Sequence, residues 1–364
     1  MPARKVSIDS RADDIVALVC HDKKDIIIEK CDLSTVIHTI PTGIYKLDGM
    51  IGGGIPIGHT TLFWGYKGSA KTSSCQRVIG NANKMCSTCF KQIPDCKCKE
   101  GPRKFVTAYF AAEPIVFTEW SKRLGVDESM IIVRPTTAEE AFDVMLSLVD
   151  SGKVDLIVLD SIAALIPEAE SEGGMGDWQQ GAQARIIGKF ARKIQSSINR
   201  SKKEYDRATT LLFINQVRMK ITMYGDPKIA PGGMAMGFAN ALEIFFQAKN
   251  KAEVEKDEVL GEKPVAIEID YGVEKRRYGA PKYSGSYRMA LRNIGGKCPG
   301  EILDEKPLRV DGIKLGLVAK TEGMYRFGDI VLGKNLEDVD EFLVKNKEVT
   351  DALRNAVVEI IKIM

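Results

Sequence analysis

Short apolar segments alternate with longer amphipathic ones along most of the chain. Five runs rich in β-branched or aromatic residues predict buried strands. These runs are Thr60–Trp64, Phe105–Phe110, Met130–Val133, Leu156–Leu159 and Thr210–Ile214. Strands that alternate with helices are typical of βαβ units, so the pattern predicts an α/β fold with a mainly parallel, twisted sheet.

Two segments between these strands have the periodicity of a helix. In Ala138–Asp150 the apolar residues recur at i, i+3, i+4 and i+7, which places them on one face. They are Ala141, Val144, Met145 and Leu148. Gly181–Asn199 predicts a second helix with a basic side, which carries Arg185, Lys189, Arg192 and Lys193. We expect this side to attract phosphates, although a solvated charged face has the same pattern.

The last third of the chain has a different pattern. The charged segment 250–264 predicts a loop. After it, Val265–Tyr271 and Ser286–Arg292 predict antiparallel strands at an edge of the sheet. Residues 304–364 contain short strands and a closing helix, Val349–Ile363, and predict a small C-terminal α/β domain. We therefore expect a core at 41–303, preceded by a separate N-terminal segment at 1–40.

Composition narrows the class of protein. Of the 364 residues, 44% are hydrophobic and 28% are charged, and the net charge is +3. These values are near the average for soluble globular proteins, which excludes disordered and collagen-like chains. The length suits one large domain with a smaller companion, or two domains.

The small net charge hides two basic segments. Residues 184–207 and 272–297 each carry a net charge of +6, so the rest of the chain carries −9. Local basic patches on an acidic body indicate discrete polyanion sites and not a wholly basic nucleic-acid coat.

No segment has the composition of a membrane span or a secretory signal. The uncharged stretch Met50–Tyr66 contains Gly, Thr and His and lacks the ~18 consecutive apolar residues that a spanning helix needs. Residues 1–5 lead into polar residues without an apolar signal region. We expect a cytoplasmic protein without membrane partners, in which clustered thiols more often bind metal than form disulfides.

Four of the eight cysteines are clustered. Cys86, Cys89, Cys96 and Cys98 have the spacing C-x2-C-x6-C-x-C within a short segment, 84–104, which we call the cysteine insert. A tetrahedral structural Zn²⁺ suits this spacing, and free thiols or redox pairing are the alternatives. The scattered cysteines are expected to be ordinary small apolar residues. They are Cys20, Cys31, Cys75 and Cys298.

A P-loop follows the first predicted strand and opens a helix. Its residues are Gly65, Tyr66, Lys67, Gly68, Ser69, Ala70, Lys71 and Thr72. In such loops backbone N–H groups cradle phosphates, the Lys reaches the terminal phosphates and the Thr hydroxyl binds Mg²⁺. Ala70 stands where a second Gly is typical, and its Cβ penalises positive φ, so the loop can bind phosphate only if this residue stays in an allowed region.

A second oxygen ligand for Mg²⁺ is predicted at the end of another strand. The apolar run Val154–Leu159 ends at Asp160, and a carboxylate there can complete the metal shell opposite Thr72. Apolar strands often end in Asp, so this signal gains weight only together with the P-loop.

Several ordered motifs along the chain resemble those of the RecA family of recombinases. They are Thr42–Asp48, Asp160–Glu170, Glu172–Asp177, Phe213–Lys220, Gly323–Tyr325 and Gly333–Lys334. The resemblance covers most of the chain and implies a RecA-like P-loop ATPase core. It is weakest in residues 1–40, where the family has an oligomerisation segment, and in the cysteine insert.

The resemblance also implies roles for residues at the nucleotide. Glu113 falls where the family keeps the glutamate that activates the attacking water, and Gln216 where a glutamine senses the γ-phosphate. Trp120 matches the aromatic residue that stacks on adenine. Lys275 and Arg277 match two cations that reach a neighbouring subunit's phosphates. Each position also has a purely structural interpretation. Glu113 would be a surface carboxylate and Gln216 an amide at the end of a strand. Trp120 would be a core residue, and Lys275 and Arg277 would belong to a solvated run of charges.

Two DNA-binding loops are implied at 172–181 and 218–233. Such loops bind single strands through backbone N–H groups, cations and apolar side chains. The DNA-binding candidates are Gly173, Gly174, Met175, Trp178, Arg185, Arg218, Lys220, Met223, Tyr224, Gly232 and Gly233.

The family resemblance implies an ATP-dependent DNA recombinase. Such proteins form filaments on single-stranded DNA, pair it with homologous duplex DNA and exchange strands during recombination and repair. The expected cofactors are ATP, Mg²⁺ and, at the cysteine insert, Zn²⁺. Loading or single-strand-binding proteins are possible partners. Two alternatives remain: a hexameric helicase or branch-migration motor on the same core, and an ATP-gated mediator that does not hydrolyse ATP.

Overall fold

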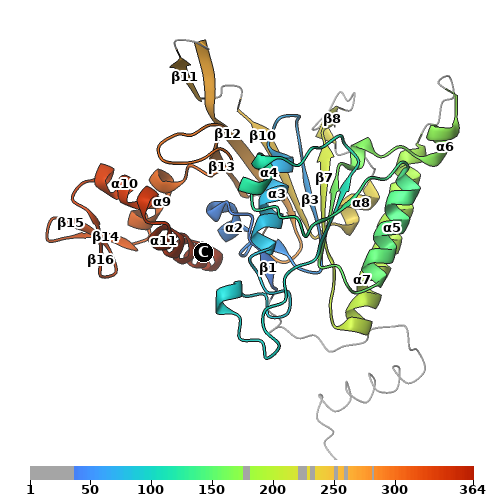
Figure 1. Ribbon diagram of the computed structural model, residues 1–364, viewed down its shortest axis with the longest axis horizontal. Helices are drawn as coiled ribbons and strands as arrows, with labels where there is room; N and C mark the ends of the chain where they lie inside the picture. The colour runs from blue at the N-terminus through green and yellow to red at the C-terminus, as the bar shows by residue number, and fades with distance from the viewer. Residues whose placement is uncertain are drawn as a thin grey trace, which may run out of the picture.

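A computed structural model describes the chain at residues 37–174, 181–219, 228–229, 234–249, 253–257, 261–280 and 283–364. Its central strands are β3 (Thr60–Gly65), β4 (Thr107–Ala111), β5 (Ile131–Val133), β6 (Leu156–Asp160), β7 (Thr210–Gln216) and β10 (Leu242–Ala248). Three more strands extend one edge: β11 (Glu253–Asp257), β12 (Gly261–Arg276) and β13 (Tyr283–Ala290). Within the described ranges these nine strands form one sheet (Figure 1).

The strands of the sheet follow the order β11-β12-β10-β3-β7-β6-β4-β5, with β13 also paired to β12. From β10 to β5 all neighbours are parallel, whereas β12 is antiparallel to β10, β11 and β13. This arrangement confirms the predicted, mainly parallel α/β sheet with antiparallel strands at one edge. In this register Gly65 lies opposite Gln216, and Ala111 lies opposite Asp160. The carboxyl ends of four strands therefore meet at one edge of the sheet.

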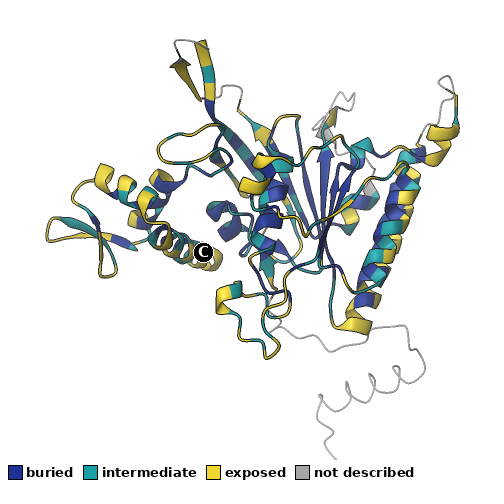
Figure 2. Cartoon of the chain, viewed as in Figure 1, coloured by how far each residue is buried: buried dark blue, intermediate teal, exposed yellow. Residues whose placement is uncertain are grey.

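Helices cover both faces of the sheet. They are α2 (Tyr45–Met50), α3 (Lys71–Ala82), α4 (Glu119–Arg123), α5 (Ala138–Asp150), α6 (Glu168–Glu172), α7 (Ala182–Tyr205) and α8 (Met234–Ala239). Helices α5 and α7 lie side by side on one face, where Phe142 and Phe190 stack with ring centroids 4.1 Å apart (Figure 1). On the other face α3 packs against Phe63 and Tyr109 of the strands. Alternate strand residues point to the two faces, which divides the core into two clusters. The central strands are buried along most of their length (Figure 2).

Short elements complete this core. Strand β1 (Thr39–Ile40) pairs with β2 (Ile55–Pro56), and β8 (Arg218–Met219) pairs with β9 (Lys228–Ile229). Two 3-10 turns, Ile93–Asp95 and Ile162–Ala164, lie in the cysteine insert and after β6. Among the described residues, no helix is both long enough and apolar enough to cross a bilayer.

Two expectations about the strands are wrong. Met130–Val133 was expected to be buried, but β5 is an edge strand whose Ile131 and Ile132 are each 44% exposed. An apolar run cannot reveal whether a further strand will cover it. Segment 250–264 was expected to be a loop, but β11 and the start of β12 pair as a hairpin that projects from the sheet (Figure 1). Its residues are charged because this hairpin has almost no core to cover.

The C-terminal residues form a separate layer beside α2. Its elements are α9 (Glu305–Lys314), β14 (Val318–Thr321), β15 (Met324–Phe327), β16 (Ile330–Gly333), α10 (Leu336–Lys345) and α11 (Lys347–Ile363). The three strands form their own small sheet over a separate apolar cluster. Helix α11 packs so closely on α2 that a Cβ at Gly49 would lie 2.8 Å from Ile361. Arg354 of α11 also binds both carboxylate oxygens of Asp304, at 2.8 and 2.6 Å.

Candidate nucleotide-binding site

The P-loop connects the end of β3 to the start of α3. Gly65 has to be glycine, because a Cβ there would lie 1.9 Å from the carbonyl oxygen of Phe246 in β10. Ala70 immediately precedes α3 and has φ 56° and ψ 24°. The residue therefore occupies the small left-handed region, which an L-residue with a Cβ can enter at a cost of ~1–2 kcal/mol. The loop keeps its shape with alanine, but under local strain.

Lys71 is buried and folded back onto the loop. Its Nζ donates to the carbonyl oxygens of Gly65, at 3.1 Å, and Tyr66, at 2.6 Å, and lies 3.3 Å from Ser69 Oγ. Burial lowers the pKa of Lys71, and the nearby Asp160 and Glu113 carboxylates oppose this shift. The oxygens that Lys71 contacts are neutral, so an anionic phosphate would be a stronger partner.

Thr72 and Asp160 meet directly, as their separate motifs predict. Thr72 Oγ1 donates to Asp160 Oδ2 at 2.8 Å, and the hydroxyl of Tyr109 donates to the same oxygen at 2.7 Å. Burial raises the pKa of Asp160, whereas these two hydrogen bonds lower it. Tyr109 was not among the residues predicted for the site. Its signal in the sequence was a phenol within a mainly apolar strand, because a buried Tyr hydroxyl usually has a partner.

Glu113 lies between Ser161 and Gln216. Its backbone N–H donates to the carbonyl oxygen of Asp160 at 3.0 Å, which ties the residue to the end of β6. Its carboxylate accepts hydrogen bonds from Ser161 Oγ and, at 2.9 Å, from Gln216 Nε2. Ser161 is a further residue that the sequence analysis missed. The carboxylate is thus held at the same edge of the sheet as Thr72 and Asp160.

Trp120 lies in α4 against the P-loop helix. Its indole Nε1 donates to Ser73 Oγ of α3 at 3.3 Å, and the ring is half-buried against the core. The ring therefore lies one residue along α3 from Thr72, and part of it remains accessible to a ligand.

A family model described as the RecA N-terminal domain matches residues 21–276. The chain belongs to the RecA family. It is similar to Protein RecA of Chloroflexus aurantiacus, with 32% identity over 88% of this chain and 82% of that protein. It is 33% identical to Protein RecA of Oleidesulfovibrio alaskensis, over 90% of this chain and 84% of that protein. It is also 33% identical to Protein RecA of Aquifex aeolicus, over 89% of this chain and 84% of that protein. The comparisons confirm the family membership inferred from the motifs.

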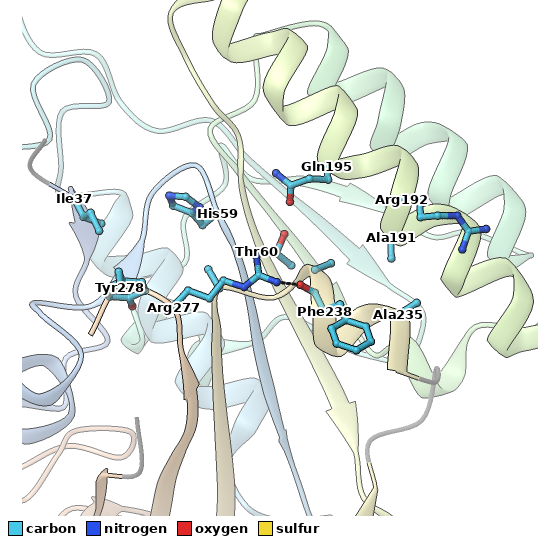
Figure 3. A pocket seen from close by; sticks show the side chains of 12 residues that line it. Ile37, His59, Thr60, Ala191, Arg192, Gln195, Ala235, Phe238, Arg277 and Tyr278 are labelled. Atoms are coloured by element: carbon cyan, nitrogen blue, oxygen red, sulfur yellow. Dashed lines mark hydrogen bonds between the residues drawn. The ribbon is translucent and has the colours of Figure 1, made fainter. Parts of the chain in front are cut away.

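The two cations implied by the RecA resemblance lie far from the P-loop of the same chain. Lys275 Nζ donates to the carbonyl oxygen of Gly237 in α8. Arg277 donates to that of Phe238 in the same helix (Figure 3). Partial burial and the neighbouring Arg277 lower the pKa of Lys275. The N–H of Arg277 donates to Ala241, whose own N–H donates to Thr60, so Arg277 lies at the end of the sheet where β3 begins. The backbone of Lys275 is level with Leu62, and its side chain reaches α8 next to Arg277. Strand β3 is about 16 Å long, at ~3.3 Å per residue, so Gly65 lies at the opposite end.

A pocket of about 670 Å³ opens beside Arg277, at the end of the sheet where β3 begins (Figure 3). Its wall includes Arg277, Arg192 and Gln195 of α7, His59 before β3, and Phe238 of α8. Phe238 is 69% exposed, although it is a large apolar side chain, and the sequence analysis did not single it out. The pocket thus combines cations with exposed apolar surface.

The candidates for DNA binding are only partly described. Gly173 and Gly174 follow α6, Arg218 lies directly beyond β7, and Arg185 lies in the first turn of α7. Arg185, Lys189, Arg192 and Lys193 are all exposed, while α7 buries Ile187, Phe190 and Ile194. The other candidates lie outside the described residues. They are Met175, Trp178, Lys220, Met223, Tyr224, Gly232 and Gly233.

The structure brings the four clustered cysteines together. The Sγ atoms of Cys86, Cys89, Cys96 and Cys98 all lie within 4.8 Å of one another and could hold a metal ion. Of the scattered cysteines, Cys75 is buried as expected, and Cys20 and Cys31 lie outside the described residues. Cys298 is exposed, so the expectation of an ordinary small apolar residue is wrong for this position. The residue lies in a surface turn, before Ile302 forms a β-bridge with Met289.

Proposed function

We propose that this protein is an ATP-dependent DNA recombinase that forms filaments on single-stranded DNA and exchanges strands with homologous duplex DNA. The observation that carries the proposal is the connected set at the carboxyl edge of the sheet. There Thr72 contacts Asp160, Glu113 contacts Gln216, and Lys71 is close enough for the Asp160 and Glu113 carboxylates to raise its pKa against the effect of burial. The family membership supports the same activity.

The P-loop would bind the phosphates of ATP. The loop leads into the N-terminus of α3, where backbone N–H groups favour an anion, and Lys71 would exchange its carbonyl partners for phosphate oxygens. Thr72 Oγ1 and Asp160 Oδ2 fit Mg²⁺, because they place a hydroxyl and a carboxylate oxygen side by side and Mg²⁺ prefers hard oxygen ligands. A bound Mg²⁺ would neutralise phosphate charge. Trp120 would offer its ring to adenine.

Glu113 is our candidate for orienting and deprotonating the attacking water. Hydrogen bonds from Ser161 and Gln216 fix its carboxylate, and a fixed carboxylate can accept a proton without reorganisation. The intact set of Glu113, Lys71 and Thr72 favours hydrolysis over a mediator that only binds ATP.

Gln216 would link the nucleotide to DNA. It ends β7, and Arg218, only two residues later, opens the second implied DNA loop. Any change in the Gln216 hydrogen bond on ATP binding is thus transmitted over two residues to this loop. An effect of ATP on DNA affinity requires such a difference in contacts between two states.

Lys275 and Arg277 would act on the ATP of a neighbouring chain. They lie at the end of the sheet opposite to their own P-loop. They can therefore reach a nucleotide only if this end of one sheet meets the P-loop end of the sheet in the next chain. A cation supplied in trans stabilises transition-state charge and makes hydrolysis depend on assembly. We assign residues 1–40 to oligomerisation, 41–303 to the ATPase core and 304–364 to a small C-terminal domain.

The decisive experiment combines the purified protein with ATP, single-stranded circular DNA and homologous linear duplex. We expect joint molecules that depend on homology and ATP. Unwinding of a forked duplex without homology would instead indicate a motor. Nucleotide binding without DNA-stimulated phosphate release would indicate a mediator.

A further inference from the structure

The cysteine insert is a loop without a core of its own. It begins at Lys84, two residues after the end of α3, and returns to the sheet before β4. All of residues 88–104 are described, and none of them is buried. Met85, Cys86 and Ser87, near the start of the insert, are buried. Burial of side chains therefore anchors the first residues but cannot hold 88–104 in one conformation, so another source of folding free energy is needed there.

The four thiols have the geometry of a tetrahedral metal site. The Sγ atoms of Cys86 and Cys98 are 3.9 Å apart, and those of Cys89 and Cys96 are 3.7 Å apart. A tetrahedron with Zn–S distances of ~2.3 Å has S···S edges of about 3.8 Å. A disulfide would require ~2.05 Å, so neither pair is bonded.

The backbone brings the two halves of the cluster, Cys86 with Cys89 and Cys96 with Cys98, to the same point. The N–H of Cys86 donates to the carbonyl oxygen of Lys91, and the N–H of Phe90 donates to that of Cys86, both at 2.8 Å. These bonds form a tight turn around Cys86 and Cys89. The second pair follows the 3-10 turn Ile93–Asp95, which directs Cys96 and Cys98 back toward the first.

The ligand chemistry favours Zn²⁺. The insert contains no His, so the ligands are four soft thiolates, which select Zn²⁺ or iron over Mg²⁺ and Ca²⁺. An iron–sulfur cluster would hold the thiolates further apart than the contacts around a single ion. Zn²⁺ with four thiolates carries a charge of −2, and the six exposed Lys and Arg residues of the insert offset this charge.

Besides Met85, which is buried in the core, the insert contacts Arg207 and His38. Arg207 donates to Ser87 Oγ at 3.2 Å and also pairs with Asp155, next to β6. The ring of Phe90, the residue after Cys89, contacts His38 with centroids 4.6 Å apart. His38 immediately precedes β1, where the described chain enters the core. The position of Phe90 depends on the turn that contains Cys86 and Cys89.

We propose that Cys86, Cys89, Cys96 and Cys98 bind one Zn²⁺ as thiolates, and that this ion fixes the cysteine insert against His38 at the entry to the core. The site lies on the side of the molecule where β1 enters, away from the P-loop edge (Figure 1). Its role is thus structural, and it is independent of the nucleotide chemistry proposed above.

The first test is the metal content of the full chain, purified under reducing conditions without chelators. We expect equimolar zinc by elemental mass spectrometry and, after exchange with Co²⁺, the absorption bands of a tetrahedral cobalt thiolate. The double variant Cys89→Ser/Cys96→Ser should lose the zinc. The matched control Cys298→Ser, which alters an exposed cysteine outside the cluster, should keep it. Iron, absence of metal with reduced thiols, or the intact mass of two disulfides would each overturn the proposal.

The second test concerns the contact with His38 and uses the unmodified protein, so it does not depend on the folding of a variant. Removal of zinc by a chelator should increase hydrogen exchange in segments 84–104 and 37–40, and added zinc should reverse this. Phe90→Ala should keep its zinc and increase exchange only at 37–40. Unchanged exchange at 37–40 in both experiments would refute the proposed link to His38.

Discussion

The side-chain amide of Gln216 donates a hydrogen bond to the carboxylate of Glu113 at 2.9 Å, across 103 positions of sequence. Gln216 is the last residue of β7 and Glu113 follows β4, and these two strands are separated in the sheet by β6. The contact joins the candidate base for ATP hydrolysis to the segment that leads into a DNA loop. It gives one physical route by which nucleotide and DNA could affect each other.

Replacement of Glu113 should separate ATP binding from turnover. In Glu113→Gln the amide cannot accept the proton of the attacking water, so we expect DNA-stimulated phosphate release to fall ~10²–10⁴-fold. Binding of a fluorescent ATP analogue should change little, because Lys71 and Thr72 are intact. Glu128→Gln, at an exposed position, is the control. Near-normal turnover in Glu113→Gln would remove Glu113 from the mechanism.

Replacement of Gln216 should weaken the coupling between ATP and DNA. Fluorescence anisotropy with a labelled single strand measures the affinity with ATP and with ADP. Allosteric coupling is typically ~5–150-fold, and in Gln216→Ala we expect this ratio to approach one. Gln247→Ala, at an exposed position of β10, should keep the ratio of the unmodified protein. A full ratio in Gln216→Ala would contradict the proposed link.

The action of Lys275 and Arg277 in trans predicts complementation between variants. A double variant, Lys275→Ala/Arg277→Ala, should lose ~10³-fold or more in turnover, the usual effect of removing such cations. Lys71→Ala should also be inactive. A mixture of the two should exceed either alone, because some interfaces join an intact P-loop to intact cations. Arg292→Ala, an exposed residue in the same basic segment, is the control. A mixture without recovered activity would argue for action within one chain.

The left-handed conformation of Ala70 predicts that glycine is more stable there. Ala70→Gly removes the Cβ that strains the loop at φ 56°, so the free energy of unfolding should rise by about 1 kcal/mol. Ala184→Gly in α7 has the opposite expectation, a loss of about 1 kcal/mol, since its backbone is helical. Urea denaturation measures both. Equal destabilisation by the two changes would show that Ala70 is not strained.

Asp48 predicts a pH dependence of stability. Burial raises the pKa of Asp48 to about 7, although hydrogen bonds from Thr42 and Gly43 lower it. An unfolded Asp has a pKa of ~3.9, so the native state binds more protons between these values. The contribution of this group to stability is therefore complete below ~pH 4 and is lost as the pH rises through 7.

The measurement for Asp48 is urea denaturation at two pH values. Between about pH 5 and about pH 8 this group alone should lower the free energy of unfolding by about 2–3 kcal/mol. Asp48→Asn does not titrate and should lack this part of the pH dependence. The same pH dependence in both proteins would show that Asp48 does not titrate in this range.

The sequence by itself determined the chemistry that is local in the chain. The P-loop residues are contiguous, and the apolar run before Asp160 predicts that this residue ends a strand. The α/β class and the meeting of Thr72 with Asp160 could therefore be inferred from the alternation of strands and helices. The cysteine spacing likewise suggested one cluster, because a short loop limits where four thiols can lie.

Only the tertiary structure decided which distant residues meet. The contact of Gln216 with Glu113, the hydrogen bonds of Ser161 and Tyr109, and the position of Lys275 at the far end of the sheet depend on strand order and register. Strand order also leaves β5 at an edge and allows a charged segment to pair as the β11–β12 hairpin. Periodicity reports which face of an element is apolar, whereas its neighbours are chosen by packing across the whole chain.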